Sequence, residues 1–406
     1  MNRNSIITAA ALTLIAAGLL LAGPLDPPAG PVTSTYKTLT EVEPRIAINA
    51  TNTPGDADSL FKITQPGSYY LTGNVTGVAA KHGVEIAVAV NGPSVTIDLM
   101  GYELAGDAGS LDGISVTVAG TRNVAIRNGT VRAWGGDGVD VSGSTNNLLD
   151  GLRVEGNRGR GIDAGSASTI TGCTASFNTG NGIFASTGST VTGCTAFANT
   201  GTGIFADSGS TVTGCTARLN SGDGVSAGSS STVTGCTAQF NIGRGIFTFN
   251  GSTVTGCTAR LNSGDGIQVV SDCRVTDNSC DSNGNGSGDG AGIHATSSDN
   301  RIEGNNCTGA DRGIDVDVAG NIIIRNTCSG NTTNWDVVAG TSASSCRASP
   351  ARPSSATPAA SRPAPPTPTP TSRTNVCSKR LAYRFMGRND LPHLLTTHSL
   401  TKGPLQ

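Results

Sequence analysis

The sequence predicts an all-β fold: a single-stranded right-handed parallel β-helix of about ten or more coils with a 21-residue repeat. Three observations predict it. The chain is rich in glycine and poor in aromatic residues, Asn and Cys recur at a constant spacing, and short β-favouring segments alternate with turn-forming clusters. Because one such unit is too short to bury a core alone, the units must stack and share a thin interior.

The repeat is clearest between residues 161 and 267, where each unit has 21 residues. Three kinds of position keep this step: a Cys, an Asn, and a Gly followed by Ile or Val. The Cys positions are Cys173, Cys194, Cys215, Cys236 and Cys257. The Asn positions are Asn157, Asn178, Asn199, Asn220, Asn241, Asn262 and Asn283. The Gly pairs begin at Gly161, Gly182, Gly203, Gly224, Gly245 and Gly266, with looser ones at Gly113, Gly138, Gly292 and Gly313.

The content of each unit favours strands over helices. Residues 204–206 and 211–213 are short alternating segments of β-favouring type. Gly, Ser and Asn, which form turns, separate them. No unit contains ten residues with helical apolar spacing, and the Leu-rich consensus of leucine-rich repeats is absent. We therefore expect three strands per coil, each paired in parallel with the next coil about 4.8 Å away, and connections of right-handed sense.

The strand pattern also predicts which side chains face the interior. In one coil these are Ile204, Ala206, Val212, Cys215 and Ala217, with their equivalents directly above and below. We expect the recurring Asn to lie inside as well. An interior Asn can bond backbone groups and the amide of its neighbour one coil away.

The register of the cysteines predicts buried packing rather than disulfides. Stacked side chains place their Cβ atoms about 4.8 Å apart, beyond ideal disulfide geometry. No His accompanies them and no Cys-x-x-Cys occurs, which argues against a metal site. After Cys257, Asn278, Asn305 and Asn326 take the column, and Cys280, Cys307 and Cys328 move to the neighbouring inward position. Cys273, Cys346 and Cys377 fall outside both columns.

Composition excludes several classes of protein. The chain has 56 Gly but only 9 Phe, 5 Tyr and 2 Trp, so a large aromatic core is impossible. Only 14% of residues are charged and the net charge is −2, which argues against disorder of the whole chain. Residues 341–406 hold nine Lys or Arg and one acid (+8), leaving about −10 on the rest. The body therefore shows no nucleic-acid footprint.

The two ends differ from the body. Arg3 and the apolar run of residues 6–22 predict a secretory signal peptide over residues 1–22 rather than a membrane anchor, so no membrane span is expected after its removal. We expect residues 23–60 to form an N-terminal segment and cap, and residues 61–340 to form the β-helix. Residues 341–406 are Pro-, Ser- and Arg-rich. They are either a disordered tail or the product of a reading-frame shift.

The opening segments PGSYYLTGNV and VTIDLMGYEL, followed by the Gly-Ile coils, support a family resemblance. Over residues 60–340 the chain resembles secreted bacterial right-handed β-helix repeat proteins of the pectin-lyase-like superfamily. The resemblance implies the fold and an extracellular or cell-envelope location. It implies no single activity, because lyases, hydrolases, epimerases and non-catalytic proteins share this fold. The catalytic motifs of the polygalacturonases, epimerases and pectate lyases are missing, so no catalytic residue is carried over.

The residue after each Gly-Ile or Gly-Val pair should point outward, in a column along one face. This outer column reads Ser115, Asp140, Asp163, Phe184, Phe205, Ser226, Phe247, Gln268, His294 and Asp315. Asp140 and Asp163, with Arg160 beside them, could bind Ca²⁺ or share a raised pKa as glycosidases and lyases require. His294 beside Asp315 could act as an oriented base. The competing interpretation is that the residues of both groups are ordinary solvated side chains on a polar surface.

Two further features of the body could contact a ligand. Phe184, Phe205 and Phe247 could stack on a sugar ring, or cover a neighbouring segment of the chain. The stretch DSNGNGSGD resembles half of a Ca²⁺ loop but lacks its final Glu, so a long turn is the competing interpretation. Its candidate ligands are Asp281, Asn285 and Asp289. No other cofactor is expected.

The repeat favours binding over catalysis, because near-identical coils offer little local variation from which to build an active site. We expect a non-catalytic protein with extracellular polysaccharide or an envelope surface as its partner, grading into a structural spacer. The alternative is a polysaccharide lyase, hydrolase or epimerase acting on acidic glycans from the outer face. Asp140, Asp163, Arg160, His294 and Asp315 are its candidate catalytic residues. The sequence does not indicate an oligomeric state.

Overall fold

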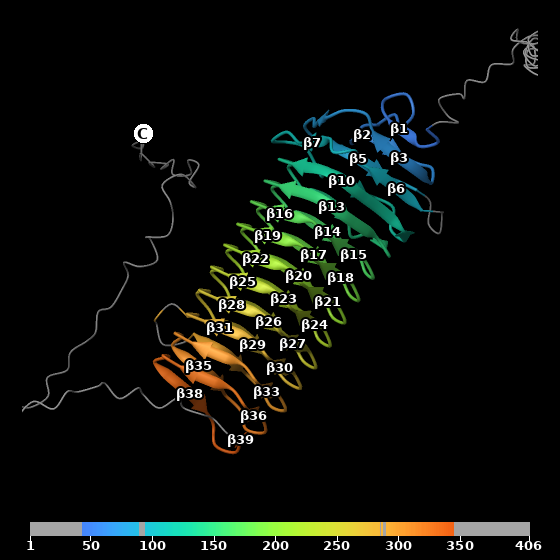
Figure 1. Cartoon of the computed structure of the whole chain (residues 1–406). Coiled ribbons are helices and arrows are strands. Elements are labelled where there is room, and N and C mark those ends of the chain that lie inside the picture. Colours follow the sequence, from blue (N-terminus) through green and yellow to red (C-terminus); the bar gives the residue numbers. More distant parts are fainter. Residues whose placement is uncertain (1–42, 89–93, 285, 287–289, 345–406) are drawn as a thin grey trace, which may run out of the picture. The chain divides into compact units, whose positions relative to one another are not determined.

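The computed structural model describes residues 43–88, 94–284, 286 and 290–344, which form a stack of β-coils (Figure 1). All pairings between named strands are parallel, and no helix occurs among these residues. The expected signal peptide and the basic segment lie outside the described residues, except for residues 341–344. The prediction of an all-β parallel solenoid is confirmed.

One side of the stack is a 13-stranded sheet, here called sheet B, with one strand per coil. This exceeds the ten coils marked in the sequence, because the first and last coils lack the Gly-Ile or Gly-Val pair and because Gly83-Val84, which marks the second coil, was not counted. Its strands are β2 (Ser59–Ile63), β5 (His82–Ile86), β8 (Ile114–Val116), β11 (Val139–Val141), β14 (Ile162–Ala164), β17 (Ile183–Ala185), β20 (Ile204–Ala206), β23 (Val225–Ala227), β26 (Ile246–Thr248), β29 (Ile267–Val269), β32 (Ala291–Ala295), β35 (Arg312–Val316) and β38 (Thr333–Val337).

The other strands form a 24-stranded sheet, here called sheet A, apart from β9 (Thr121–Arg122) and β12 (Ser144–Thr145), which pair with each other. Most coils give sheet A two short strands separated by a turn, whereas β10 and β13 run straight through. Its strands are β1 (Ile46–Ile48), β3 (Gly67–Leu71), β4 (Val75–Thr76), β6 (Val95–Asp98), β7 (Glu103–Ala105), β10 (Val124–Arg132), β13 (Leu148–Glu155), β15 (Thr169–Thr171), β16 (Thr174–Ser176), β18 (Thr190–Thr192), β19 (Thr195–Phe197), β21 (Thr211–Thr213), β22 (Thr216–Arg218), β24 (Thr232–Thr234), β25 (Thr237–Gln239), β27 (Thr253–Thr255), β28 (Thr258–Arg260), β30 (Arg274–Thr276), β31 (Ser279–Asp281), β33 (Arg301–Glu303), β34 (Asn306–Thr308), β36 (Ile322–Ile324), β37 (Thr327–Ser329) and β39 (Ser342–Ser344).

The coils stack at the predicted 21-residue step. Val191 pairs with Val212, and Ala196 with Ala217, so identical side chains lie above one another. Between the two sheet A strands of each repeat coil a glycine adopts a left-handed conformation, as at Gly193 with φ 62°. Glycine suits this turn because it has no Cβ to clash.

The interior is as thin as the composition requires. The predicted inward residues of the Ile204 coil are all buried. The Asn column is inside too, and each amide donates from Nδ2 to Oδ1 of the next Asn, as from Asn199 to Asn220 at 3.0 Å. Because Nδ2 of Asn199 also donates to the Ala175 carbonyl, both of its donors and its backbone N–H are satisfied inside.

The described cysteines are free and buried, as predicted for the eight that belong to the two columns. Cys280, Cys307 and Cys328 continue the column of Ala259, and Asn278 accepts a hydrogen bond from the backbone of Cys257. Cys273 follows a column of buried serines ending at Ser252, a column that our sequence analysis did not identify. Cys346 and Cys377 lie outside the described residues.

One large side chain departs from this thin interior. Trp134 is fully buried, and its indole N–H donates to the Leu104 carbonyl at 3.1 Å. A Cβ at Gly83 would lie 2.7 Å from the indole, and one at Gly113 2.9 Å from it. These glycines therefore create the space that the indole fills.

Strand pairing continues at both ends of the described stack. β1 lies in the segment expected to cap the N-terminus and pairs in parallel with β3. At the other end β38 contains Trp335 and pairs with β35, and β39 pairs with β36.

Candidate functional site

The outer face of sheet B carries the predicted column in unbroken register. Asp140 pairs with Asp163, Phe184 with Phe205, and His294 with Asp315. Pairing extends the column by Lys62 and Glu85 at one end and by Asp336 at the other. The face therefore has a polar N-terminal part, an aromatic middle and a charged C-terminal part.

The first polar cluster contains Asp137, Asp140 and Asp163, whose carboxylate oxygens lie within 4.8 Å of one another. Arg160 forms an ion pair with Oδ2 of Asp163, and its backbone N–H donates to Asp137. Asp140 accepts from the backbone and hydroxyl of Ser142. The structure thus brings together Asp140, Asp163 and Arg160, the three candidate residues that the sequence placed here.

Asp163 has an unusual environment for a carboxylate. It is only 6% exposed, and its Oδ1 is buried without a hydrogen-bond partner. Burial raises the pKa of Asp163 to about 6; Arg160 opposes this shift, whereas Asp140 and Asp137 add to it. Burial likewise raises the pKa of Asp137. Near neutral pH, Asp163 is therefore poised to gain or lose a proton.

Aromatic side chains occupy the middle of the column. The Phe184 and Phe205 rings are stacked, with centroids 4.9 Å apart and planes 3° apart. Arg160, from the preceding coil, lies over Phe184 at 4.2 Å. Because these two partners come from neighbouring coils on opposite sides of Phe184 along the stack, they cover both faces of its ring. Phe205 is followed by the small Ser226.

Phe247 belongs to a second aromatic group. Arg244 lies over its ring at 3.7 Å, and Phe249 contacts it edge-on at 4.7 Å between centroids. Arg244 is also held by an ion pair with Asp223 at 2.8 Å and a hydrogen bond to Gln268. This arginine is therefore fixed in place over the ring.

The second polar cluster surrounds His294. Its Nδ1 lies 2.9 Å from Asp265, and its Nε2 lies 3.0 Å from Asp317 and 3.8 Å from Asp315. Burial alone would lower the pKa of His294, but hydrogen bonds and charge from Asp265, Asp317 and Asp315 raise it to about 9. At neutral pH the ring is a cation that donates from both nitrogens. This state does not suit the general-base role suggested by the sequence.

A surface hollow of about 320 Å³ lies beside this cluster. It is lined by Arg312, Asp315, Val316, Asp317, Asp336, Val337 and Val338. Arg312 forms ion pairs with Asp315 at 2.7 Å and with Asp336 at 3.1 Å. The hollow thus offers both carboxylate acceptors and a guanidinium at one end of the column.

Several of these contacts were missed by sequence reasoning. Asp265 belongs to a turn position that alternates in charge from coil to coil, and nothing in that pattern marks it as a partner of His294. Lys62, which pairs with Glu85 at 2.9 Å and with Asp56 at 2.6 Å, lies in a coil without the Gly-Ile signature. Asp56, Asp58 and Glu85 form a further group of close carboxylates.

The candidate Ca²⁺ loop is only partly described. Asp281 forms an ion pair with Arg260 at 2.9 Å and accepts from the Thr308 hydroxyl at 3.0 Å. Asn285 and Asp289 lie outside the described residues. The neighbours of Asp281 therefore account for its carboxylate without an ion.

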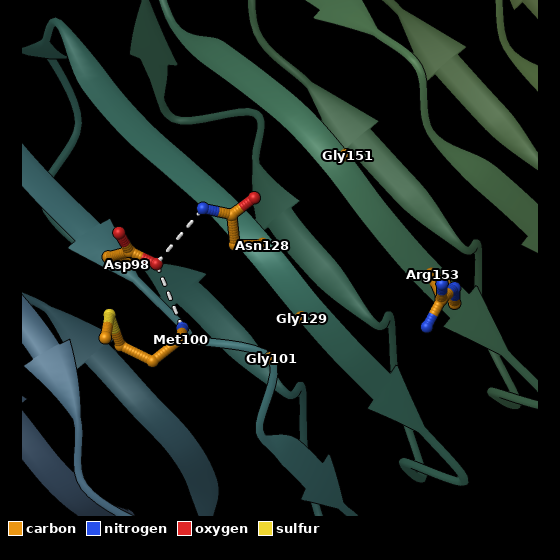
Figure 2. A pocket seen from close by; sticks show the side chains of 7 residues that line it. All are labelled: Asp98, Met100, Gly101, Asn128, Gly129, Gly151 and Arg153. Carbon is orange, nitrogen blue, oxygen red and sulfur yellow. Dashed lines mark hydrogen bonds between the residues drawn. The ribbon is translucent and has the colours of Figure 1, made fainter.

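A separate hollow of about 430 Å³ lies on sheet A, away from the outer column (Figure 2). Asp98 forms its acidic side and accepts hydrogen bonds from the Met100 backbone and the Asn128 amide. Arg45 and Arg127 form ion pairs with the same carboxylate. Gly101, Gly129 and Gly151 form its floor, and Arg153 lies at its far end. Sequence reasoning gave no signal for this hollow.

Comparison with known proteins agrees with the fold. A family model described as the right-handed β-helix region matches residues 89–221 and 201–281. The A-module of a mannuronan C-5 epimerase from Azotobacter vinelandii is similar in structure, with a TM-score of 0.50 and 16% identity, over 75% of this chain and 89% of that chain.

Two other solved structures resemble the chain less closely. Tailspike protein 3 of bacteriophage CBA120 has a TM-score of 0.48 and 12% identity, over 85% of this chain and 69% of that chain. A pectate lyase has a TM-score of 0.31 and 16% identity, over 74% and 80%. No curated protein sequence matches the chain. At such identities the likeness concerns the fold and not the activity. Within the described residues, no helix is long and apolar enough to cross a bilayer.

Proposed function

We propose that this chain, whose residues 89–221 and 201–281 match the right-handed β-helix family model, binds an extracellular polysaccharide along the outer face of sheet B. The binding surface is the outer column from Asp140 to Asp336. This role is non-catalytic binding, and its ligand is a polysaccharide of the cell surface or surroundings.

The order of side chains along this one column supports the proposal. A stacked aromatic pair, Phe184 and Phe205, lies between the Asp163 cluster and the His294 cluster on a continuous face. Aromatic rings provide apolar contact for the C–H groups of a sugar, and carboxylates and arginines bond its hydroxyls. A linear polymer lying along the column would meet these groups in succession.

The test is a titration of the full chain with defined oligosaccharides. Polygalacturonate, alginate and a neutral glucan oligomer of matched length are titrated by calorimetry into the wild type. They are then titrated into Phe184→Ala/Phe205→Ala. Because the aromatic pair would contact the sugar, we expect the double variant to bind the preferred oligomer about tenfold more weakly.

Thr192→Ala/Thr213→Ala is the matched control, since it truncates outward side chains of sheet A in the same two coils. It should retain the wild-type affinity. Absence of binding by the wild type to every oligomer would refute the proposal, as would equal losses in the two double variants.

A second candidate function is polysaccharide cleavage or epimerisation. It is favoured by one observation, the pKa of about 6 at Asp163 beside Asp140, which suits proton transfer near neutral pH. A screen for unsaturated uronate products, new reducing ends or epimerised residues, with and without Ca²⁺, would detect it. Asp140→Asn/Asp163→Asn should abolish any turnover found. Full turnover in that variant would remove these residues as the active site.

If the protein uses Ca²⁺, the residues that fit are Asp137, Asp140 and Asp163. The buried and unpartnered Oδ1 of Asp163 supplies an oxygen ligand beside two further carboxylates. Oxygen ligands of this kind are those Ca²⁺ prefers. Calorimetry with CaCl₂ on the wild type and on Asp163→Asn would test this, and an unchanged Ca²⁺ affinity in the variant would exclude the cluster.

A further proposal concerns the two ends of the chain. We infer that residues 1–22 are removed on secretion and that residues 341–406 are either a tail or a frame-shifted terminus. N-terminal sequencing of the protein from culture medium tests the first inference. Resequencing of the gene tests the second, because a coil-like peptide in another frame would identify a shift.

A further inference from the structure

Most coils turn out of their last sheet A strand through a residue with positive φ, and in the repeat coils this residue directly precedes the interior Asn. In the central coils these residues include Phe177 (φ 56°), Leu219 (φ 60°), Phe240 (φ 58°) and Leu261 (φ 54°). Within this central stretch one coil has the small Ala198 at the position, and coils nearer the ends have only small residues there, namely Ala133, Gly156, Ser282, Gly309 and Gly330. Large apolar side chains are therefore confined to the centre of the stack at a position that favours glycine.

This choice of residue works against folding stability. The left-handed conformation is unfavourable for a bulky side chain, and glycine adopts it freely. Core packing does not offset the strain, because Phe177 is 52% exposed and Phe240 is 38% exposed. Strained and exposed residues of this kind concentrate where a surface makes functional contacts.

Phe177 and Phe240 belong to a continuous row that crosses consecutive coils. Phe177 contacts Phe197 edge-on, with centroids 5.3 Å apart. The Arg218 guanidinium then lies 5.9 Å from the Phe197 ring and 5.5 Å from the Phe240 ring. We call Phe177, Phe197, Arg218 and Phe240 the aromatic–arginine row.

Arg218 gives the row its charge. It is exposed, and no carboxylate of the described residues forms an ion pair with it. A guanidinium lying between aromatic rings is held in place while its donors remain free for a planar anion. In contrast, Arg160 and Arg244, which lie in turns just before strands of sheet B, are paired with Asp163 and Asp223.

We propose that the aromatic–arginine row is a second polysaccharide-binding strip, on sheet A and its edge, and that it selects chains bearing carboxylates. The proposal rests on the proposed function and adds the class of glycan. The rings contact the C–H faces of the sugars, and Arg218 bonds a uronate carboxylate. The row advances by about one coil, close to 5 Å, per side chain. An extended glycan advances by a similar distance per sugar, so it can follow the row.

The test uses variants in which stability and binding should change in opposite directions. Phe177→Gly/Phe240→Gly removes two rings and relieves two left-handed side chains. We expect its Tm to equal or exceed that of the wild type and its affinity for polygalacturonate oligomers to fall about tenfold. Arg218→Gln should reduce the preference for polygalacturonate over a neutral glucan oligomer of equal length.

Leu261→Gly is the matched control, because it relieves the same conformation one coil beyond the row. It should keep the wild-type affinity for polygalacturonate. The inference is overturned if the double glycine variant and Arg218→Gln both bind polygalacturonate as the wild type does, or if Leu261→Gly weakens binding equally. Phosphatidylglycerol vesicles are titrated in parallel as a different anionic ligand. The inference also fails if the row variants lose binding to these vesicles but keep the wild-type affinity for polygalacturonate.

The same titrations separate this inference from the proposed function. Loss of binding in Phe184→Ala/Phe205→Ala with wild-type affinity in the row variants would refute the second strip alone. If the wild type binds neither polygalacturonate nor any other oligomer, both proposals are refuted.

Discussion

Asn199 and Asn220 lie 21 residues apart and directly above one another, with Nδ2 of Asn199 donating to Oδ1 of Asn220 at 3.0 Å. Both side chains are buried. The same bond recurs from Asn157 through Asn283, so the column forms a continuous chain of amides. It ties each coil to the next inside the solenoid.

Removing one amide from the middle of this column should be costly. Asn220→Ala leaves the backbone N–H and Nδ2 of Asn199 without their acceptor, and the Ala196 carbonyl without its donor. An unsatisfied buried polar group costs about 1–3 kcal/mol, so we expect a total loss of about 3–5 kcal/mol. Urea unfolding monitored by circular dichroism measures it. Thr213→Ala, on the outer face of the same coil, should cost less than about 1 kcal/mol. A similar small loss for Asn220→Ala would contradict this account.

The buried thiols should be unreactive until the chain unfolds. All nine described cysteines are free and buried, so the reagent cannot reach them in the folded protein. Neighbouring thiols raise the pKa of Cys194 to about 12, whereas they lower the pKa of Cys173 and Cys236, which burial alone must protect. A thiol that stays protonated is a poor nucleophile. In Cys346→Ser/Cys377→Ser, Ellman's reagent should label none of the nine in buffer and all nine in guanidinium chloride. Rapid labelling of any of them in the folded protein would show that the columns open.

The charge of His294 should stabilise the fold at neutral pH. Its pKa rises on folding from 6.5 to about 9, so the stabilisation is complete below about pH 6.5 and is lost as the pH rises through 9. The full effect is at most about 3 kcal/mol. Relative to His294→Gln, the wild type should therefore lose stability between pH 6.5 and 9.5. Unfolding at several pH values measures the difference, and NMR of the imidazole measures the pKa directly. A pKa near 6.5 would show that Asp265 and Asp317 do not hold the ring as a cation.

The protonation of Asp163 should make the folding stability depend on pH between about pH 4 and pH 7. Its pKa rises on folding from 3.8 to about 6, so protonation favours the folded state. The stabilisation is complete below about pH 3.8 and is lost as the pH rises through 6. Compared with Asp163→Asn, the wild type should gain stability, by up to about 3 kcal/mol, when the pH falls from 7 to 4. The free energy of unfolding of both proteins is measured at several pH values. If it changes with pH by the same amount in both, the pKa of Asp163 is not raised and the prediction is wrong.

Much of the fold could be predicted because one interaction pattern is repeated. Once Val191 and Val212 occupy equivalent positions, parallel pairing fixes every neighbour, including the order of Asp163, Phe184 and Phe205 on the outer face. The first and last coils were less visible, because their sequences share the backbone path but not the Gly-Ile signature. The large buried Trp134 was equally hidden, since its space depends on glycines in other coils.

The solenoid, its Asn and Cys columns and the succession of side chains along sheet B follow from the spacing of the residues, because a constant 21-residue step converts sequence spacing directly into position. Which of these neighbours form bonds is visible only in the folded molecule. Asp265 reaches His294 from a turn, Arg160 covers Phe184, and Arg218 lies between Phe197 and Phe240. Such contacts depend on side-chain direction, burial and local charge, which vary between coils whose backbones are nearly identical.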